Sequence, residues 1–547
     1  MLKAVKTYIN SFDRFIGVAY HLLMYKNIGI LLYFIGLLFL FANITLFDRV
    51  LREDAFHYIY KGMEITNGDF GLVQFQTIGW PLLLSIVYKI LGVKELFVAM
   101  YVARWVSILC ICLSVIPISI ICKKVAEDKY SDGVCIVVLT AFSLSPFILF
   151  AGKHAMTEPL FLLLALLCIV FMVGEKITVK NIILASFFAS LSYYVKPNGI
   201  FLLGVILITL FIRGDSGKKV LLQNMALAFI VFILVSSPHL IARYIEFGSA
   251  FDYGANSKYF VDSYKEVWAD NIPKLSFIEY LRSHNFHDYY NKFIDKGFLH
   301  VLNNIFSNSF VISIWRYLFV ISIIISLVIK RNQRYYPLFI LIVVSIIGLS
   351  FVFHIFGNYR HLIYLIPFFL IFASGALCGL EFIKHVKVVN IVITFVLAVT
   401  IINIPNIEFF KESRIGIPVV KDTWAVWAAR NVTGNVAIVE GGDLLVMSQY
   451  YKPDSDKRIQ RNFGEVKQMI KPMRPGLYES IDHAIKDFKR MGINYVITDE
   501  CNIRRRPYLK EIKKDKWKHI FQHLNYFEHG DKGAVLSGVN IYKINYQ

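Results

Sequence analysis

Acidic, basic and imidazole side chains gather in a few short stretches beside long apolar segments. The first stretch, Asp48–Leu91, contains a predicted amphipathic helix that carries Glu53, Asp54 and Tyr58. A carboxylate followed by aromatic residues has the chemistry of a general base for a hydroxyl group. The alternative is an interfacial anchor in which Arg52 pairs with the acid. We favour an active site with Asp54 at its centre, because ionisable groups near a membrane interior are functional candidates.

A second acidic candidate is Glu158, in the turn GKHAMTEP at Gly152–Pro159. Thr157 as an N-cap, and a proline in the first helical turn, also describe an ordinary helix start. An acidic residue there suits the helix dipole. Capping leaves His154 unexplained, so Glu158 and His154 both remain site candidates.

Two cationic residues lie at the ends of apolar segments on the predicted non-cytoplasmic face. The opposite face is predicted to be cytoplasmic because its loops are basic. Lys196 precedes a Pro-Asn-Gly turn, and Arg360 lies between His354 and His361. The ordinary explanation is that each side chain snorkels, so that its charged end reaches water at the membrane surface. An anionic partner is the alternative, and phosphate suits both residues because arginine offers a fork and lysine a point charge.

The composition is that of a membrane protein with some soluble mass. Of the 547 residues, 56% are hydrophobic and 18% are charged, whereas soluble domains have about a quarter charged residues. The net charge of +19 comes from short clusters between apolar runs, with no recognised nucleic-acid reader motif, so nucleic-acid binding is not expected. The cysteines form no CxxC pair, which argues against zinc or redox chemistry.

Apolar segments predict about eleven transmembrane helices, since a span needs about 20 apolar residues. Lys and Arg residues in alternate connections predict a cytoplasmic N-terminus. The predicted spans are Ile28–Phe47, Phe97–Cys122, Val134–Ala151, Pro159–Val173, Ile182–Val195, Ile200–Ile212, Val220–Ile241, Phe310–Ile329, Tyr336–Phe353, Leu362–Leu380 and Val388–Ile404. The pair around Lys196 could instead be one kinked element.

The fold class expected is an α-helical polytopic membrane protein with a C-terminal soluble α/β domain. The transmembrane domain covers residues 1–404, with outer loops at 48–96 and 243–309, and the second loop is expected to form helices over the membrane face. The α/β domain covers 405–547, on the non-cytoplasmic side. Its expected strands are Asn435–Glu440, Asn494–Thr498 and Val539–Ile544, and its expected helices are Asp422–Asn431 and Tyr478–Met491.

These stretches together resemble the GT-C superfamily of membrane glycosyltransferases that use polyprenyl-phosphate-linked sugars. The branch is that of the protein O-mannosyltransferases and the lipid A aminoarabinose transferases. Ala55 stands where that branch has glutamate, and its Lys-Pro-Pro motif is absent. The resemblance rests on DAFHY at 54–58, GWPLLL at 79–84, HAMTEP at 154–159, KPNG at 196–199, NYR at 358–360 and the strand GINYVIT at 492–498.

The resemblance implies transfer of a sugar from a polyprenyl-phosphate donor to a lipid, glycan or protein acceptor on the non-cytoplasmic face of a cell membrane. Asp54 would be the base of a single inverting displacement, and the alternative is a two-carboxylate scheme with Glu158 as the second catalytic residue. Substrate-binding candidates are Glu53, Tyr58, His154, Lys196, His354, Arg360 and His361. No cofactor is required, although Asp54 with His154 or Glu158 could hold a divalent cation. The rivals are a transporter or flippase of lipid-linked glycans, which would have paired broken helices, and a non-catalytic membrane protein.

The predicted topology can be tested with single cysteines and a membrane-impermeant thiol reagent. Cysteines at Asp69, Ser263 and Asp456 should label from outside intact cells, whereas cysteines at Gly217 and Gln333 should not. Labelling of positions 217 and 456 from the same side would contradict the gathering of site candidates on one face.

Overall fold

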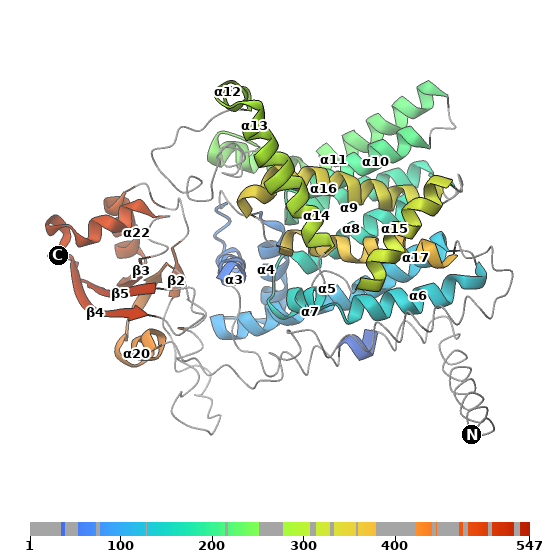
Figure 1. The fold of residues 1–547 in the computed structure, drawn as a ribbon. Helices are drawn as coiled ribbons and strands as arrows, with labels where there is room; N and C mark the ends of the chain where they lie inside the picture. The colour runs from blue at the N-terminus through green and yellow to red at the C-terminus, as the bar shows by residue number, and fades with distance from the viewer. Residues whose placement is uncertain are drawn as a thin grey trace, which may run out of the picture.

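The computed structural model is a bundle of helices with a small sheet domain at its C-terminal end (Figure 1). It describes residues 34–38, 53–72, 77–126, 128–174, 176–213, 217–250, 277–306, 313–328, 333–356, 359–378, 423–439, 445, 470–473, 478, 480–500, 506–529 and 537–546.

The bundle helices fall close to the predicted spans. They are α5 (Leu96–Val125), α6 (Asp128–Ser143), α7 (Pro146–Lys153), α8 (Glu158–Met172), α9 (Val179–Val195), α10 (Gly199–Ile212), α11 (Lys218–Phe247), α15 (Ser313–Val328), α16 (Tyr336–Phe356) and α17 (Ile366–Cys378). Helices α9 and α10 pack against each other as separate elements, so they do not form one kinked helix. The predicted spans Ile28–Phe47, except for residues 34–38, and Val388–Ile404 lie outside the described residues.

Within the described ranges, two helices are long and apolar enough to cross a membrane, namely α5 and α11. A third is added if α6 and α7, bent by 56° at their junction, count as one span. The predicted span Val134–Ala151 is therefore interrupted by a bend. Ser145 is extended because it precedes Pro146, and a residue before proline is disfavoured in the α conformation.

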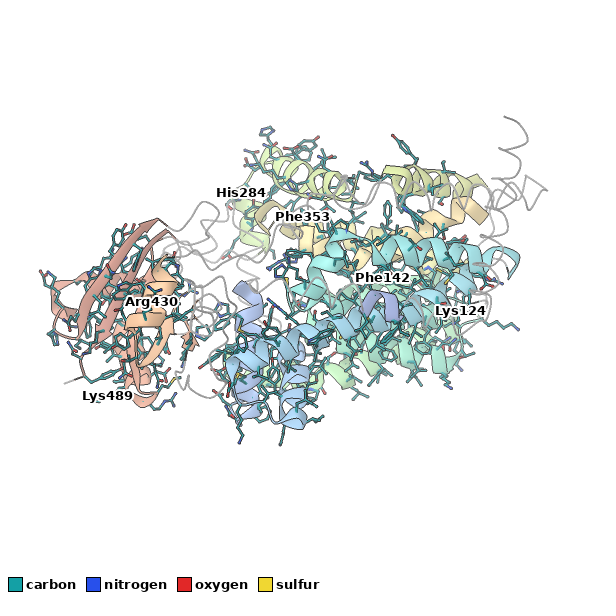
Figure 2. The ribbon with its side chains drawn as sticks, turned by 90° about the horizontal axis from the view of Figure 1, so that it is seen from below. Lys124, Phe142, His284, Phe353, Arg430 and Lys489 are labelled. Carbon is teal, nitrogen blue, oxygen red and sulfur yellow. The ribbon has the colours of Figure 1, made fainter. Side chains whose placement is uncertain are left out.

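Three cations cap helix ends at the end of the bundle farthest from the sheet domain, where Figure 2 shows Lys124. Lys124 Nζ donates to Val170 O at 2.7 Å, Arg213 donates to the carbonyl groups of Met172 and Gly174, and Arg334 donates to Lys124 O at 3.3 Å. The last carbonyl groups of a helix have no partner within it, so cations stabilise them. These residues belong to connections predicted to be cytoplasmic, and the structure groups them at one end.

The described part of the stretch Asp48–Leu91, residues 53–72 and 77–91, contains two packed helices at the opposite end of the bundle. Helix α3 (Glu53–Thr66) ends before Gly68, which has φ +93°, and α4 (Gly79–Leu91) follows. The helices approach closely at Gly62, where a Cβ would lie 3.1 Å from Leu84 Cβ. Tyr88 then joins α4 to α5 by donating its hydroxyl hydrogen to Ala99 O at 3.0 Å.

The loop predicted at 243–309 is shorter than expected, because α11 continues as a helix to Phe247. Residues 277–306 are helical: α12 (Phe277–Ser283), α13 (Phe286–Tyr289), the π-helix η3 (Tyr290–Leu299) and α14 (His300–Ile305). Of these, η3 and α14 pack along α16, and at Gly297 a Cβ would lie 2.3 Å from Ser350 O. Figure 2 shows His284 and Phe353 in this region. The expectation of helices in this loop is met for these residues.

The C-terminal domain has a five-stranded sheet in the order β2-β1-β3-β5-β4. Strand β1 (Asn435–Ile438) is parallel to β2 (Ile470–Pro472) and β3 (Ile493–Asp499), whereas β5 (Ser537–Ile544) is antiparallel to β3 and to β4 (Phe521–His529). Helices α20 (Thr423–Asn431) and α22 (Ile481–Arg490) lie on opposite sides of the sheet (Figure 1). Three strands and both helices match the expectation, and β2 and β4 are additional.

A polar network fastens α22 to the edge strand β2. Asp487 accepts hydrogen bonds from Lys471 Nζ at 2.8 Å, Tyr478 Oη at 2.5 Å and Arg490 at 2.5 Å. Burial alone would raise the pKa of Asp487, but these three donors lower it from 3.8 to about 2. The pKa is depressed in the folded state, so the stabilisation is present above pH 3.8 and is lost as the pH falls through about 2.

Replacing Asp487 by asparagine should destabilise the sheet domain by about 1–3 kcal/mol, because Lys471 and Tyr478 lose their acceptor while buried. Amide exchange of α22 in the full-length protein at pH 7 measures the effect. Asp515→Asn is the control, because Asp515 pairs with Lys518 at 2.6 Å in full exposure and should be neutral. Equal exchange rates in both variants would show that the network is not stabilising.

Candidate functional site

A buried ion pair joins two of the predicted site residues. Lys196 Nζ lies 2.7 Å from Glu158 Oε1, and the side chains are 13% and 4% exposed. Glu158 is the first residue of α8, and Lys196 is the C-cap of α9. The two charges therefore meet where α8 begins and α9 ends.

The local sequence explains the position of Glu158. Thr157 is at the N-cap position as predicted, but its side chain makes no capping bond. Its hydroxyl instead donates to Glu158 Oε2 at 3.3 Å. With Pro159 in the first turn, a backbone donor is already missing there. The carboxylate of Glu158 thus lies at the positive end of the α8 dipole and accepts from both Thr157 and Lys196.

The turn between α7 and α8 has a strained backbone. Ala155 has φ +54°, and it is the one non-glycine residue with positive φ among the described residues. This conformation costs an alanine about 1–2 kcal/mol. The Ala155 carbonyl accepts a hydrogen bond from Trp80 Nε1 at 3.0 Å, and both residues are fully buried. The preceding residue, His154, is buried and lies 4.4 Å from the Phe150 ring, centroid to centroid.

The Lys196 side of the pair is held by close backbone packing. Lys196 is extended, with φ −149° and ψ +142°. A Cβ on Gly199 would lie 2.3 Å from Tyr193 N, so the chain can turn into α10 only with glycine there. Thr77 donates its hydroxyl hydrogen to Val195 O, one residue before Lys196.

Arg360 and His361 lie beside the α7–α8 turn. They belong to the 3-10 helix η5 (Tyr359–Leu365), which packs against α7 and α8. Phe161 of α8 and Tyr364 of η5 make an edge-to-face contact with centroids 4.9 Å apart. Arg360 and His361 are half-buried, and His354 is near the end of α16 with its side chain outside the described residues.

The remaining predicted residues are on α3. Glu53 and Asp54 form its first turn, and their side chains lie outside the described residues, whereas Tyr58 is half-buried. The next residues, Ala55 and Phe56, are buried in one apolar cluster with Trp80, Ala155 and Met156. The first turn of α3 therefore packs into the core that also surrounds the α7–α8 turn.

Arg243 and His239 on α11 were not predicted as site residues. Both are buried, at 0% and 2% exposure. The His239 ring lies 5.1 Å from the ring of Tyr194, two residues before Lys196, and Arg243 is one helical turn farther along α11. Arg243 stacks over Phe247 at 5.0 Å. The four-residue spacing of His239 and Arg243 places them on one helical face and could have identified them from the sequence. They were missed because the sequence from Arg243 onward was interpreted as a loop.

No group of three or more His, Cys, Asp or Glu side chains suited to a metal ion occurs among the residues that the structure describes. The candidate cation site at Asp54 involves a side chain outside that set.

Comparisons with known proteins identify the fold. No protein-family model and no curated protein sequence matches this chain. Among solved structures, ArnT from Cupriavidus metallidurans bound to undecaprenyl phosphate is similar, with a TM-score of 0.55 and 11% identity over 94% of this chain and 98% of ArnT. The oligosaccharyltransferase AglB from Archaeoglobus fulgidus, in complex with an inhibitory peptide and a dolichol-phosphate, has a TM-score of 0.53 and 12% identity over 96% of this chain and 75% of AglB. The expected GT-C-like fold, helical with a C-terminal sheet domain, is confirmed.

The ion pair predicts a strong coupling between its two residues. Glu158→Gln or Lys196→Met alone should destabilise the protein by about 3–5 kcal/mol, because the other charge stays buried without its partner. The double variant should lose clearly less than the sum of the single variants. Thermal unfolding of the solubilised protein measures this, with Lys514→Gln, which removes an exposed pair to Glu511 at 3.5 Å, as the control. Additive effects would mean that the two charges do not interact.

Proposed function

We propose that this chain is an integral-membrane glycosyltransferase that takes a sugar from a polyprenyl-phosphate donor. The transfer would occur at an acceptor hydroxyl on the non-cytoplasmic face, with the N-terminus cytoplasmic and the sheet domain outside. One observation carries the proposal: site candidates from α3, the α7–α8 turn, the α9–α10 turn and η5 meet at one end of the bundle. This end belongs to a fold shared with ArnT bound to undecaprenyl phosphate and AglB bound to dolichol-phosphate.

The donor phosphate requires cations, and the ion pair changes which cation suits it. Lys196 already bonds to Glu158 at 2.7 Å, so part of its charge is neutralised within the protein. Arg360, on η5 beside this turn, and Arg243, on the outer end of α11, offer planar guanidinium forks that match a phosphate. We assign the leaving phosphate mainly to these arginines, with His361 and His354 nearby in sequence.

Asp54 is assigned as the general base. It would take the proton of the acceptor hydroxyl while the acceptor oxygen bonds to the anomeric carbon and the bond from that carbon to the phosphate oxygen breaks. The polyprenyl phosphate then leaves with the bonding electrons, and the configuration at the anomeric carbon inverts. Glu53 and Tyr58, on the same helix, are assigned to substrate binding.

Glu158 has a different assignment from the one that the sequence suggested. Its carboxylate accepts from Lys196 and Thr157 and is 4% exposed, which suits a residue that orders the site better than one that attacks a sugar. His154, three residues before Thr157, is assigned to the same wall of the site.

The transporter alternative predicts donor binding without turnover.

Asp54→Asn tests the proposal. A general base contributes about 100- to 10,000-fold in rate, so the variant should lose most turnover while expression and donor binding stay close to normal. Transfer of radiolabel from polyprenyl-phosphate sugars in membranes containing the protein is the measurement. Glu53→Gln, about 100° around the same helix, should lower turnover much less and act mainly on KM, as expected for a residue assigned to substrate binding.

Near-normal turnover by Asp54→Asn would remove the catalytic assignment and leave an interfacial anchor. Binding of every donor without transfer by the unmodified protein would instead favour the transporter.

A further inference from the structure

The segment from Thr77 to Trp80 contacts both backbone segments that carry the ion pair, one next to Lys196 and one shortly before Glu158. Thr77 donates its hydroxyl hydrogen to the Val195 carbonyl, next to Lys196, and Trp80 donates its indole hydrogen to the Ala155 carbonyl, three residues before Glu158. These contacts cross 118 and 75 residues of sequence. One short segment at the start of α4 therefore spans the ends of α7 and α9.

The packing at this segment leaves little room for displacement. A Cβ on Gly79 would lie 2.7 Å from the carbonyl carbon and oxygen of Tyr194. Such contacts are with backbone, which cannot rotate away. Trp80 is 0% exposed and Thr77 is 5% exposed, so water does not compete for either hydrogen bond.

The hydrogen bond from Trp80 is made to Ala155, a residue in a strained backbone conformation. Ala155 is in the left-handed region at φ +54°, which alanine rarely adopts. Strained residues persist only where their surroundings over-determine them, and they cluster at functional sites. The direction of the Ala155 carbonyl toward the indole, together with the burial of Ala155, supplies that constraint.

We propose that Trp80 is a positioning residue that holds the α7–α8 turn in its strained form and so fixes His154 and Glu158 for the reaction. Thr77 does the same for the Lys196 side. The inference rests on the proposed glycosyl transfer for its effect on rate, but the conformational part stands without it. A purely space-filling tryptophan would pack in the same place without requiring its indole hydrogen bond.

The test uses Trp80→Phe, Ala155→Gly and the double variant in the full-length protein. Trp80→Phe keeps an aromatic ring and removes the donor, so amides of 154–161 should exchange about ten-fold faster. Its kcat should fall about 10- to 100-fold, as a misplaced site does, with a smaller change in KM. Glycine takes positive φ without strain, so Ala155→Gly should lessen the rate defect of Trp80→Phe in the double variant.

Ser85→Ala is the matched control, because it removes a buried hydroxyl of α4 that bonds within the helix, to Leu82 O at 2.8 Å. It should leave exchange of 154–161 and kcat unaltered. If Trp80→Phe does not fold, Thr77→Val takes its place, with amides of 193–199 as the readout.

Unchanged exchange of 154–161 in folded Trp80→Phe, or of 193–199 in folded Thr77→Val, would overturn the proposal whether or not any donor supports turnover. Faster exchange in a protein that transfers no sugar would keep the positioning role and reject the glycosyltransferase assignment alone. Equal losses in kcat for Trp80→Phe and the double variant would also count against the strained turn.

Discussion

The buried ion pair of Glu158 and Lys196 is the interaction on which the end of the bundle nearer the sheet domain depends. Removing two charges from water costs several kcal/mol per ion, and attraction repays this only with good geometry and further hydrogen bonds. The 2.7 Å contact, the hydrogen bond from the Thr157 hydroxyl and the α8 dipole stabilise the buried pair and offset this cost. Such geometry requires the two helix ends to be fixed, and the contacts of the α4 start with Ala155 and Val195 fix them.

The two ends of the bundle use their charges differently. At one end, Lys124, Arg213 and Arg334 donate to carbonyl groups of neighbouring helix ends, which is an ordinary structural use of a cation. At the other end, Lys196 pairs with an acid and Arg243 stacks on an aromatic ring while fully buried. A charge is costly to bury, so buried charges at this end are a physical reason to look for chemistry there.

The sequence predicted the helices well because apolar periodicity and span length are local properties, and α8 to α10 begin and end within three residues of their predicted bounds. It missed the bend before Pro146 and the continuation of α11 through Arg243, where polar residues resemble a loop. It also missed strand β2, whose Lys471 and Pro472 are unusual in a strand and whose burial comes from tertiary packing. The pairing of Glu158 with Lys196, and the role of Trp80, are contacts between residues distant in sequence that no local pattern contains.

The sheet domain is tied to the proposed active-site helix. Helix α3 lies between the bundle and the sheet domain (Figure 1), and it contacts β2, the edge strand that Asp487 fastens to α22 through Lys471. Ala55, Phe56 and Ile59 of α3 belong to the same buried apolar cluster as Ile470 of β2. Because its edge strand packs on α3, the sheet domain is part of the support of the helix that carries Asp54.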